Sequence, residues 1–223
     1  MPFGVDEAGR GPVFGSMFAA CVRVETADHL PDGVADSKRL TPARREELAA
    51  ELRAHDRIAV GVAEITPARI DAPETDMNGL AVEAHARAIE DAFDETVIGP
   101  GESPNGHCDA CDTDEARFAR RVTDACAIDA RIEASHGADD ADPLVAAASV
   151  IAKVERDAHV AALATAHGEI GSGYPSDPTT REFLETYVAD HGELPPFARS
   201  SWSTCREALA AATQSALDAF GDG

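Results

Sequence analysis

Two stretches of the chain show clear patterns of apolar and polar positions. Residues 57–65 alternate between the two classes and are rich in β-branched side chains, which predicts a strand. After Asp142, apolar residues recur at helical spacing, which predicts a long helix that Asp142 caps. The recurring positions are Leu144, Ala147, Ala148, Ile151 and Val154.

Weaker signals place further elements before the long helix. The first residues predict a hairpin with strands at about 3–8 and 15–24. A helix is expected over 42–54, because a threonine suited to capping and a proline stand at its start. A short helix near 67–72 and a longer one over about 78–94 follow.

The middle of the chain gives a less regular pattern. Residues 99–106 resemble a loop, and we expect a short, polar strand just before Asp109. A helix over about 114–122 and a strand over about 129–134 come next. Strands that alternate with helices in this way predict an α/β fold.

Beyond about residue 166 the sequence predicts helices and loops only. One helix is expected to run to His191 and to end at Gly192, and a last helix is expected to begin near Ser203. We therefore predict three parts: an α/β core over 1–166, a helical region over 167–213 and a tail over 214–223.

The opening strand ends in the motif Val5-Asp6-Glu7-Ala8-Gly9-Arg10-Gly11-Pro12. Neighbouring residues of a strand point to opposite faces, so Asp6 and Glu7 can reach one cation only where the strand ends. The glycines provide that break and let the backbone approach a ligand closely. The motif indicates a metal site that faces a phosphate, although a surface turn after an edge strand is an equally simple reading. Its glycine spacing does not match the dinucleotide motif G-x-G-x-x-G.

Two further carboxylates stand at suitable places, Asp109 at a strand end and Asp139 before the long helix. Clustered carboxylates repel one another and raise each other's pKa, so they ionise together only when cations are bound. Oxygen ligands of this kind select Mg²⁺ or Mn²⁺ over zinc. Asp112 and Asp140 are the alternatives if the register is shifted.

The charge of the chain is strongly negative. Nineteen Lys and Arg residues stand against 41 Asp and Glu residues, which gives a formal net charge of −22. Nucleic-acid binding normally leaves a basic surface. The acids are spread along the whole chain, however, which indicates a surface adapted to concentrated salt.

Lysine is almost absent, since Lys38 and Lys153 are the only two in the sequence. Lys153 shares a face of the long helix with Ser149 and Arg156. That face has two readings, a solvated stripe of an amphipathic helix or a contact surface, and the scarcity of lysine favours a contact role.

Composition places the chain among globular proteins. A length of 223 residues with 44% hydrophobic residues is enough to fill a core. Because no apolar run is long enough to span a bilayer and no signal segment is evident, we expect a cytoplasmic protein. The five irregularly spaced cysteines predict reduced thiols, and the lone pair Cys108 and Cys111 is weak support for a zinc site.

Taken together, several motifs resemble archaeal ribonuclease HII in the same order over residues 2 to about 205, and the acidic surface indicates a halophile. Besides the opening motif, they are Asp36-Ser37-Lys38-Arg39-Leu40-Thr41-Pro42, Asp109-Ala110-Cys111-Asp112, Ala147-Ala148-Ser149-Val150-Ile151-Ala152-Lys153-Val154 and Gly171-Ser172-Gly173-Tyr174-Pro175-Ser176-Asp177-Pro178.

The resemblance implies an RNase H-like fold, a five-stranded mixed sheet flanked by helices, with a C-terminal helical appendage. It implies an endoribonuclease that hydrolyses the RNA strand of RNA–DNA hybrids and cuts 5′ to single ribonucleotides in duplex DNA. Two Mn²⁺ or Mg²⁺ ions would assist, and the products would carry 3′-hydroxyl and 5′-phosphate ends. A monomer without membrane attachment is expected.

Site residues also follow from the resemblance. The catalytic and metal-binding residues would be Asp6, Glu7, Asp109 and Asp139. Gly9, Arg10, Gly11 and Tyr174 would read the 2′-hydroxyl group, and Ser37 and Lys38 would hold phosphate. Ser149, Lys153 and Arg156 complete the predicted substrate contacts. One departure is Gly137, which stands where related sequences often have lysine.

The tail contains Gln214, Leu217 and Phe220 in the spacing Q-x-x-L-x-x-F, which resembles a peptide that binds a sliding clamp. It lacks the second aromatic residue, and an ordinary amphipathic helix end would look similar. Two other functions compete with the hydrolase: a non-catalytic module that binds hybrids, and a nuclease of the same superfamily that acts on branched DNA.

Overall fold

The computed structural model describes residues 1–34, 40–93 and 103–221, without the side chains of 27 and 215–221. Two compact units are present. The first, which we call the sheet unit, comprises Met1–Ala8, Met17–Ile65 and Asp76–Arg156. The second, the C-terminal unit, comprises Gly9–Ser16, Thr66–Thr75 and Asp157–Gly223. The units interleave along the chain, and the division at 166 and 213 stays a prediction.

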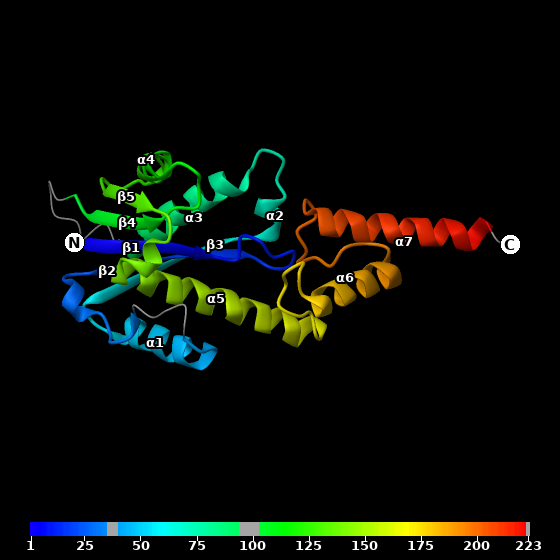
Figure 1. Cartoon of the computed structure of the whole chain (residues 1–223), viewed down its shortest axis with the longest axis horizontal. Coiled ribbons are helices and arrows are strands. Elements are labelled where there is room, and N and C mark those ends of the chain that lie inside the picture. The colour runs from blue at the N-terminus through cyan, green and yellow to red at the C-terminus, as the bar shows by residue number, and fades with distance from the viewer. Residues whose placement is uncertain (35–39, 94–102, 222–223) are drawn as a thin grey trace. The chain divides into compact units, whose positions relative to one another are not determined.

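A five-stranded mixed sheet forms the centre of the sheet unit (Figure 1), which confirms the predicted fold class. The strand order is β3-β2-β1-β4-β5. The pairs β1–β2 and β2–β3 are antiparallel, whereas β1–β4 and β4–β5 are parallel. The strands are β1 (Pro2–Ala8), β2 (Met17–Val24), β3 (Ile58–Ile65), β4 (Asn105–Asp109) and β5 (Arg131–Ser135).

Helices cover both faces of this sheet, with α1 and the first part of α5 on one face and α3 and α4 on the other (Figure 1). On the first face, Val22 and Val24 of β2 share a buried apolar cluster with Leu52 of α1 and Ile151 of α5. The helical segments of this unit are η1 (Ala27–His29), α1 (Pro42–Ala54), α3 (Met77–Ala92), α4 (Glu115–Ala125), η3 (Ala138–Asp140) and α5 (Pro143–His167), whose last residues belong to the C-terminal unit.

Glycines let two helices approach the sheet closely. A Cβ atom on Gly4 of β1 would lie 2.3 Å from the backbone of Leu144 and Val145 at the start of α5. A Cβ atom on Gly61 of β3 would lie 2.2 Å from the carbonyl oxygen of Ala88 in α3. Helices α5 and α3 therefore pack directly on the strand backbone, from opposite faces.

The predicted polar strand before Asp109 is present. Residues Asn105–Asp109 form β4, which pairs with β1 on one side and β5 on the other. Cys108 is fully buried in it, opposite Val5 of β1. Pairing on both edges thus stabilises a segment whose sequence alone gives a weak strand signal.

The C-terminal unit is helical and packs around aromatic residues. The ring of Phe14 meets those of Phe197 and Phe183 edge to face, with centroids 5.2 and 5.7 Å apart. Its helices, besides the end of α5, are α2 (Pro67–Ile70), α6 (Pro178–His191) and α7 (Ser203–Gly221). Helix α6 ends at Gly192 with φ of 73°, as the sequence predicts. Within the described ranges, no helix has the length and apolar character needed to cross a bilayer.

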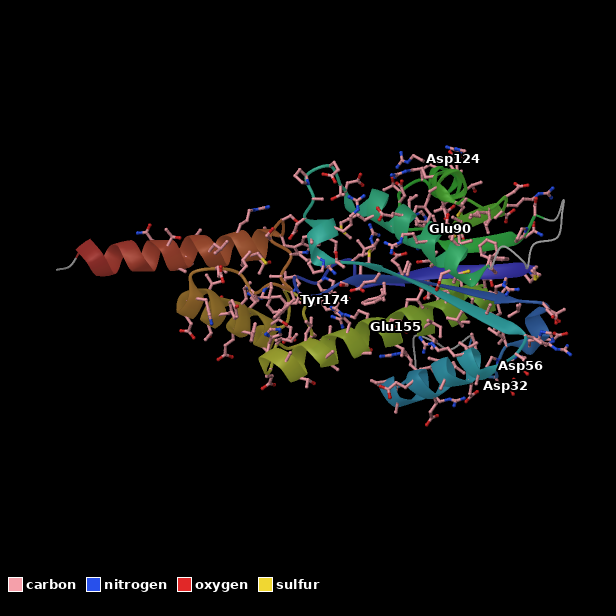
Figure 2. The ribbon with its side chains drawn as sticks, turned by 180° about the vertical axis from the view of Figure 1, so that it is seen from behind. Asp32, Asp56, Glu90, Asp124, Glu155 and Tyr174 are labelled. Atoms are coloured by element: carbon pink, nitrogen blue, oxygen red, sulfur yellow. The ribbon has the colours of Figure 1, made fainter. Side chains whose placement is uncertain are left out.

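Acidic residues project from many separate elements of the sheet unit. Figure 2 labels Asp32, Asp56, Glu90, Asp124 and Glu155, which come from two loops and from α3, α4 and α5. Because they are spread rather than gathered in one patch, their repulsion acts over the whole unit.

Candidate active site

Asp6 lies in β1 on the face that α5 covers, and it is 5% exposed. Burial raises its pKa well above the usual value, and the nearby carboxylates of Glu7 and Asp109 raise it further. A hydrogen bond with the side chain of Ser149 in α5 lowers it in part. The amino group of Lys153 donates in turn to the Ser149 hydroxyl. Ser149 is fully buried, which excludes the solvated-stripe reading for that residue.

Glu7, the next residue, points to the opposite face and meets α3. Its Oε2 lies 2.6 Å from Nε2 of His85, and both side chains are almost completely buried. The His85 ring packs edge to face on Phe118, with centroids 5.2 Å apart. Its Nδ1 is buried and has no hydrogen-bond partner among the described atoms. We did not predict His85, whose only sequence signal is a histidine among the apolar residues on the buried side of an amphipathic helix.

Asp109 stands at the end of β4, and Asp139 follows in the one-turn helix η3. The backbone N–H of Ala138 in η3 donates to Oδ1 of Asp109 at 2.7 Å. Burial raises the pKa of Asp109, and the charges of Glu7 and Asp139 raise it as well. Asp139 is buried, at 6% exposure. The four predicted carboxylates are therefore electrostatically coupled, two on β1, one on β4 and one on η3.

The alternatives Asp112 and Asp140 have different surroundings. Asp112 forms an ion pair with Arg117, whose Nε lies 3.0 Å from its Oδ2. Hydrogen bonding with Arg117, its positive charge and backbone N–H groups nearby lower the pKa of Asp112 to about 2. Asp140 is exposed, whereas its neighbour Asp139 is buried. These contacts favour Asp109 and Asp139 as the members of the cluster.

Gly137 lies at the turn that leads into η3 and Asp139. It precedes η3 with φ of 63° and ψ of 32°, a left-handed conformation that glycine adopts without strain. A glycine at this position therefore suits the local backbone.

The carboxylate cluster suits a hard divalent cation, because all its donor atoms are oxygens and the charges of neighbouring carboxylates raise the pKa of Asp6 and of Asp109. Within the described ranges, however, no three His, Cys, Asp or Glu side chains form a ready metal-binding group. Three of the carboxylates instead accept from or contact protein groups, namely the N–H of Glu7, the ring of His85 and the N–H of Ala138. Each of these contacts uses one oxygen of its carboxylate, namely Oδ1 of Asp6, Oε2 of Glu7 and Oδ1 of Asp109, and such contacts orient a carboxylate toward a cation.

The predicted ribose-reading residues lie together in the C-terminal unit. A Cβ atom on Gly11 would meet the Tyr174 ring at 3.6 Å, so the two motifs are neighbours. The N–H of Val13 donates to the carbonyl oxygen of Gly173 at 2.8 Å, which joins the two loops. Tyr174 is 38% exposed and is labelled in Figure 2. This turn and this ring are thus a surface available to a ligand.

Three other predicted substrate contacts are Ser37, Lys38 and Arg156. Ser37 and Lys38 lie outside the described residues. Arg156 is half-buried in α5, one turn beyond Lys153. Their roles toward substrate stay predictions.

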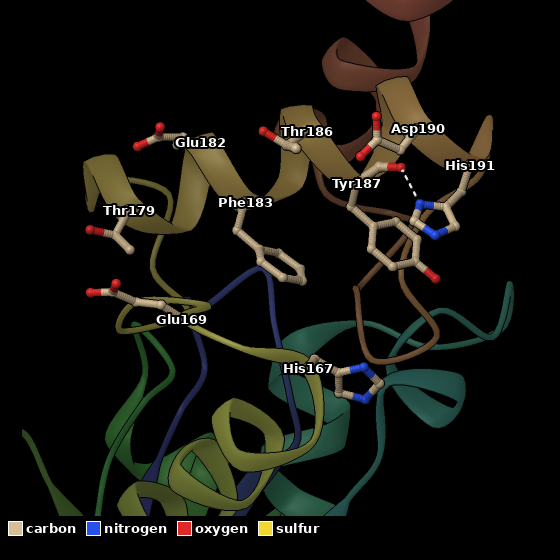
Figure 3. Close-up of a pocket in the computed structure, with 9 residues that line it drawn as sticks. All are labelled: His167, Glu169, Thr179, Glu182, Phe183, Thr186, Tyr187, Asp190 and His191. Carbon is tan, nitrogen blue, oxygen red and sulfur yellow. Dashed lines mark hydrogen bonds between the residues drawn. The ribbon is translucent and has the colours of Figure 1, made fainter.

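A separate pocket of about 520 Å³ lies in the C-terminal unit (Figure 3). Phe183 and Tyr187 of α6 line it, and the Tyr187 ring stacks on His191 with centroids 4.1 Å apart. A hydrogen bond joins Nδ1 of His191 to the carbonyl oxygen of Tyr187 at 2.9 Å. None of the predicted site residues lines this pocket.

The five-stranded mixed sheet flanked by helices, with carboxylates on β1, β4 and η3, together with its matches to ribonucleases H indicates a hydrolase of the RNase H type. The family model of ribonuclease HII matches residues 3–205. The chain belongs to the ribonuclease HII family, as its motifs predict.

Known relatives agree over nearly the whole chain. Ribonuclease HII from the halophilic archaeon Haloarcula marismortui is 60% identical over 220 residues, covering 99% of this chain and 100% of the relative. The crystal structure of ribonuclease H2 from Pyrococcus horikoshii matches with a TM-score of 0.85 at 38% identity, covering 95% of this chain and 98% of that one. The structure of the PCNA:RNase HII complex from Archaeoglobus fulgidus matches with a TM-score of 0.79 at 37% identity, covering 92% and 94%.

Proposed function

We propose that this ribonuclease H cleaves the RNA strand of RNA–DNA hybrids and cuts 5′ to single ribonucleotides in duplex DNA, leaving 3′-hydroxyl and 5′-phosphate ends. The observation that carries the proposal is the electrostatic coupling of Asp6 and Asp109 with the other two carboxylates in a ribonuclease HII chain. The exposed Tyr174 beside Gly11 supports the preference for ribose.

In this proposal Asp6, Glu7, Asp109 and Asp139 hold two Mn²⁺ or Mg²⁺ ions. Bound ions of this kind supply the charge that activates a water and stabilises the leaving 3′-oxygen. The protein's part is to orient the ligands. Ser149 and Lys153 orient Asp6 from α5, while His85 orients Glu7 from α3.

Ribose recognition falls to the turn Gly9-Arg10-Gly11 and to Tyr174. The 2′-hydroxyl group is the local feature that separates ribose from deoxyribose, and backbone amides and a tyrosine can contact it without reading a base. Sequence preference is therefore expected to be weak. Lys38, Ser37 and Arg156 would contact backbone phosphate.

Salt affects how the enzyme binds. Release of counterions contributes little affinity when the salt concentration is high. Close hydrogen bonds and metal contacts must therefore provide more of the binding than they do in a basic nuclease.

Cutting assays on three substrates test the proposal: a duplex with one ribonucleotide, the same duplex made of DNA alone, and a four-way junction. We expect Mn²⁺- or Mg²⁺-dependent cutting of the first, 5′ to the ribonucleotide, and neither of the others. Binding of hybrids without any cutting would instead support the non-catalytic module. Preferential cutting of the junction would support a nuclease for branched DNA.

A second proposal concerns the tail. We propose that Gln214, Leu217 and Phe220 bind a sliding clamp such as PCNA, because the chain is similar to the RNase HII of the PCNA complex. Their backbone lies within α7, and the side chains of Leu217 and Phe220 are not among those that the structure describes. Deletion of residues 214–223 should abolish binding to the clamp while hydrolysis continues. Equal clamp affinity of the truncated and full chains would refute this role.

A further inference from the structure

One buried side chain holds the segment Gly9–Ser16 of the C-terminal unit. Arg199 is fully buried, and three of its nitrogens donate to carbonyl oxygens of this segment. Nε donates to Gly15 at 2.9 Å, Nη1 to Arg10 at 2.9 Å and Nη2 to Gly9 at 2.6 Å. Arg199 thus joins residues that lie 184 to 190 positions away in the sequence.

The guanidinium group suits this task because its donors have a fixed, planar arrangement and it stays charged at any physiological pH. Burying a charge is costly unless hydrogen bonds satisfy it. Three carbonyl oxygens of a single loop meet that requirement only if the loop adopts one shape. Arg199 therefore selects a single conformation of the loop.

Trp202 adds a contact at the same place. Its indole Nε1 donates to the carbonyl oxygen of Gly11 at 3.2 Å. The Cζ atom of Arg199 lies 5.1 Å from the centre of the Trp202 ring, within the range of a cation–π contact. The two side chains together hold the carbonyl oxygens of Gly9, Arg10 and Gly11, which is every carbonyl of the predicted ribose-reading turn.

Fixing the oxygens of Gly9 and Arg10 also fixes the amide groups that follow them, whereas Gly11 is followed by Pro12, which has no N–H. A peptide unit is planar, and in its trans form the N–H points away from the preceding C=O. The structure has no cis peptide bond among the described residues. The contacts to Gly9 and Arg10 therefore direct the N–H groups of Arg10 and Gly11 to the side away from Arg199.

We infer that Arg199 and Trp202 are positioning residues for ribose selectivity: they hold the turn so that its amide groups can meet a 2′-hydroxyl. This inference rests on the proposed ribose-reading role of the turn. Neither residue contacts the substrate in this scheme, so their effect passes through Gly9, Arg10 and Gly11. Selectivity for the sugar then depends on residues near the opposite end of the chain.

The test compares two duplexes that differ in one group. One carries a single ribonucleotide, and the other carries a 2′-deoxy-2′-fluoro nucleotide at the same position. The ratio of their kcat/KM values measures sugar selectivity, and it is unaffected by a loss of folded protein, which lowers both values equally. The variants, made in the full chain, are Trp202→Phe, which keeps an aromatic ring but removes the indole donor, and Arg199→Lys, which keeps the charge.

We expect Trp202→Phe to lower the ratio by about tenfold, the effect of one lost hydrogen bond at its upper range. Arg199→Lys should lower it further wherever the variant folds. As a control, Arg206→Lys alters an exposed arginine whose Nη1 contacts the carbonyl oxygen of Ser201, and it should leave the ratio unchanged. If a folded Trp202→Phe enzyme kept the wild-type ratio, the inference about Arg199 and Trp202 would be wrong, while the ribose-reading role of the turn would stand. A wild-type ratio near one would overturn the ribose-reading role of the turn and the inference with it.

Discussion

Nε2 of His85 lies 2.6 Å from Oε2 of Glu7, and this contact joins helix α3 to the end of strand β1 inside the core. Asp6, one residue earlier, is held from the other face through Ser149 of α5. Two adjacent carboxylates thus depend on helices in two different layers. The proposed metal site is built on the packing of both.

Removal of the His85 contact should weaken the proposed metal site more than the fold. We expect His85→Phe, which keeps a ring of similar size, to lower activity and apparent affinity for Mn²⁺ by about tenfold or more. The reason is that Glu7 loses its orienting partner. Activity measured over a Mn²⁺ titration checks this. His85→Gln, which can still donate to Glu7, should recover part of the loss, and equal affinities in all three enzymes would contradict the role.

Asp6→Asn should nearly abolish cleavage, by roughly a thousandfold or more, while the protein stays folded. In buffer with chelator it should also raise the melting temperature near neutral pH. The folded state raises the pKa of Asp6, so the folded protein loses stability once the pH exceeds the usual pKa of an aspartate. Asparagine carries no ionisable group and removes that cost. Thermal unfolding and single-ribonucleotide cutting are the measurements. The exposed neighbour variant Asp140→Asn should keep full activity, and a large loss there would favour the shifted register.

The ion pair of Asp112 with Arg117 should contribute to acid stability. Its hydrogen bonds lower the pKa of Asp112 to about 2, below the usual value near 3.9. The contribution is therefore complete above the ordinary pKa and is lost as pH falls through the folded value near 2. Urea unfolding between about pH 5 and pH 2 should show this difference between the wild type and Asp112→Asn. Parallel curves for the two proteins would rule the contribution out.

Gly4→Ala should destabilise the sheet unit by about 3 kcal/mol or more, because the new methyl group would meet the backbone of α5 at 2.3 Å. Gly11→Ala is the matched control, since its methyl group would make an ordinary contact with Tyr174 at 3.6 Å. We expect the control to change the free energy of unfolding by less than about 1 kcal/mol. Denaturant unfolding measures both, and similar losses would show that α5 can move away from β1.

Salt should stabilise the protein. A net charge of −22, with acids on many elements, makes the folded state repel itself in dilute buffer. Between about 0.1 M and 1 M salt the screening length falls from about 10 Å to about 3 Å, so the melting temperature should rise over this range. Scanning calorimetry in KCl gives the result. An unchanged melting temperature would exclude charge repulsion as a limit on stability.

Local rules predicted most of the elements. Thr41 accepts a hydrogen bond from the N–H of Arg44 at the start of α1, as its position before a proline indicates. Asp142 accepts from the N–H of Leu144 at the start of α5. Such signals act over a few residues, so the sequence shows them directly. The strand before Asp109 needed β1 and β5 on both sides, and its local signal was correspondingly weak.

Contacts between distant residues could not be predicted in this way. His85 meets Glu7 across 78 positions, and Arg199 meets Gly9 across 190. His85 and Arg199 are buried polar side chains. The hydrophobic pattern shows that such a polar residue stands among apolar ones, but it does not predict which residue it contacts. The choice of Asp109 over Asp112 likewise rests on which carboxylate has an arginine beside it, a matter of packing rather than spacing.

The division of Asp6 and Glu7 between two faces of one strand has a consequence for how this family can change. Helices α3 and α5 each pack directly on the strand backbone at a glycine. A shift of either helix during evolution would therefore displace the carboxylate that it contacts, Glu7 for α3 and Asp6 for α5. Substitution should therefore be tolerated poorly along the inner faces of both helices, where the side chains pack on the sheet rather than face solvent.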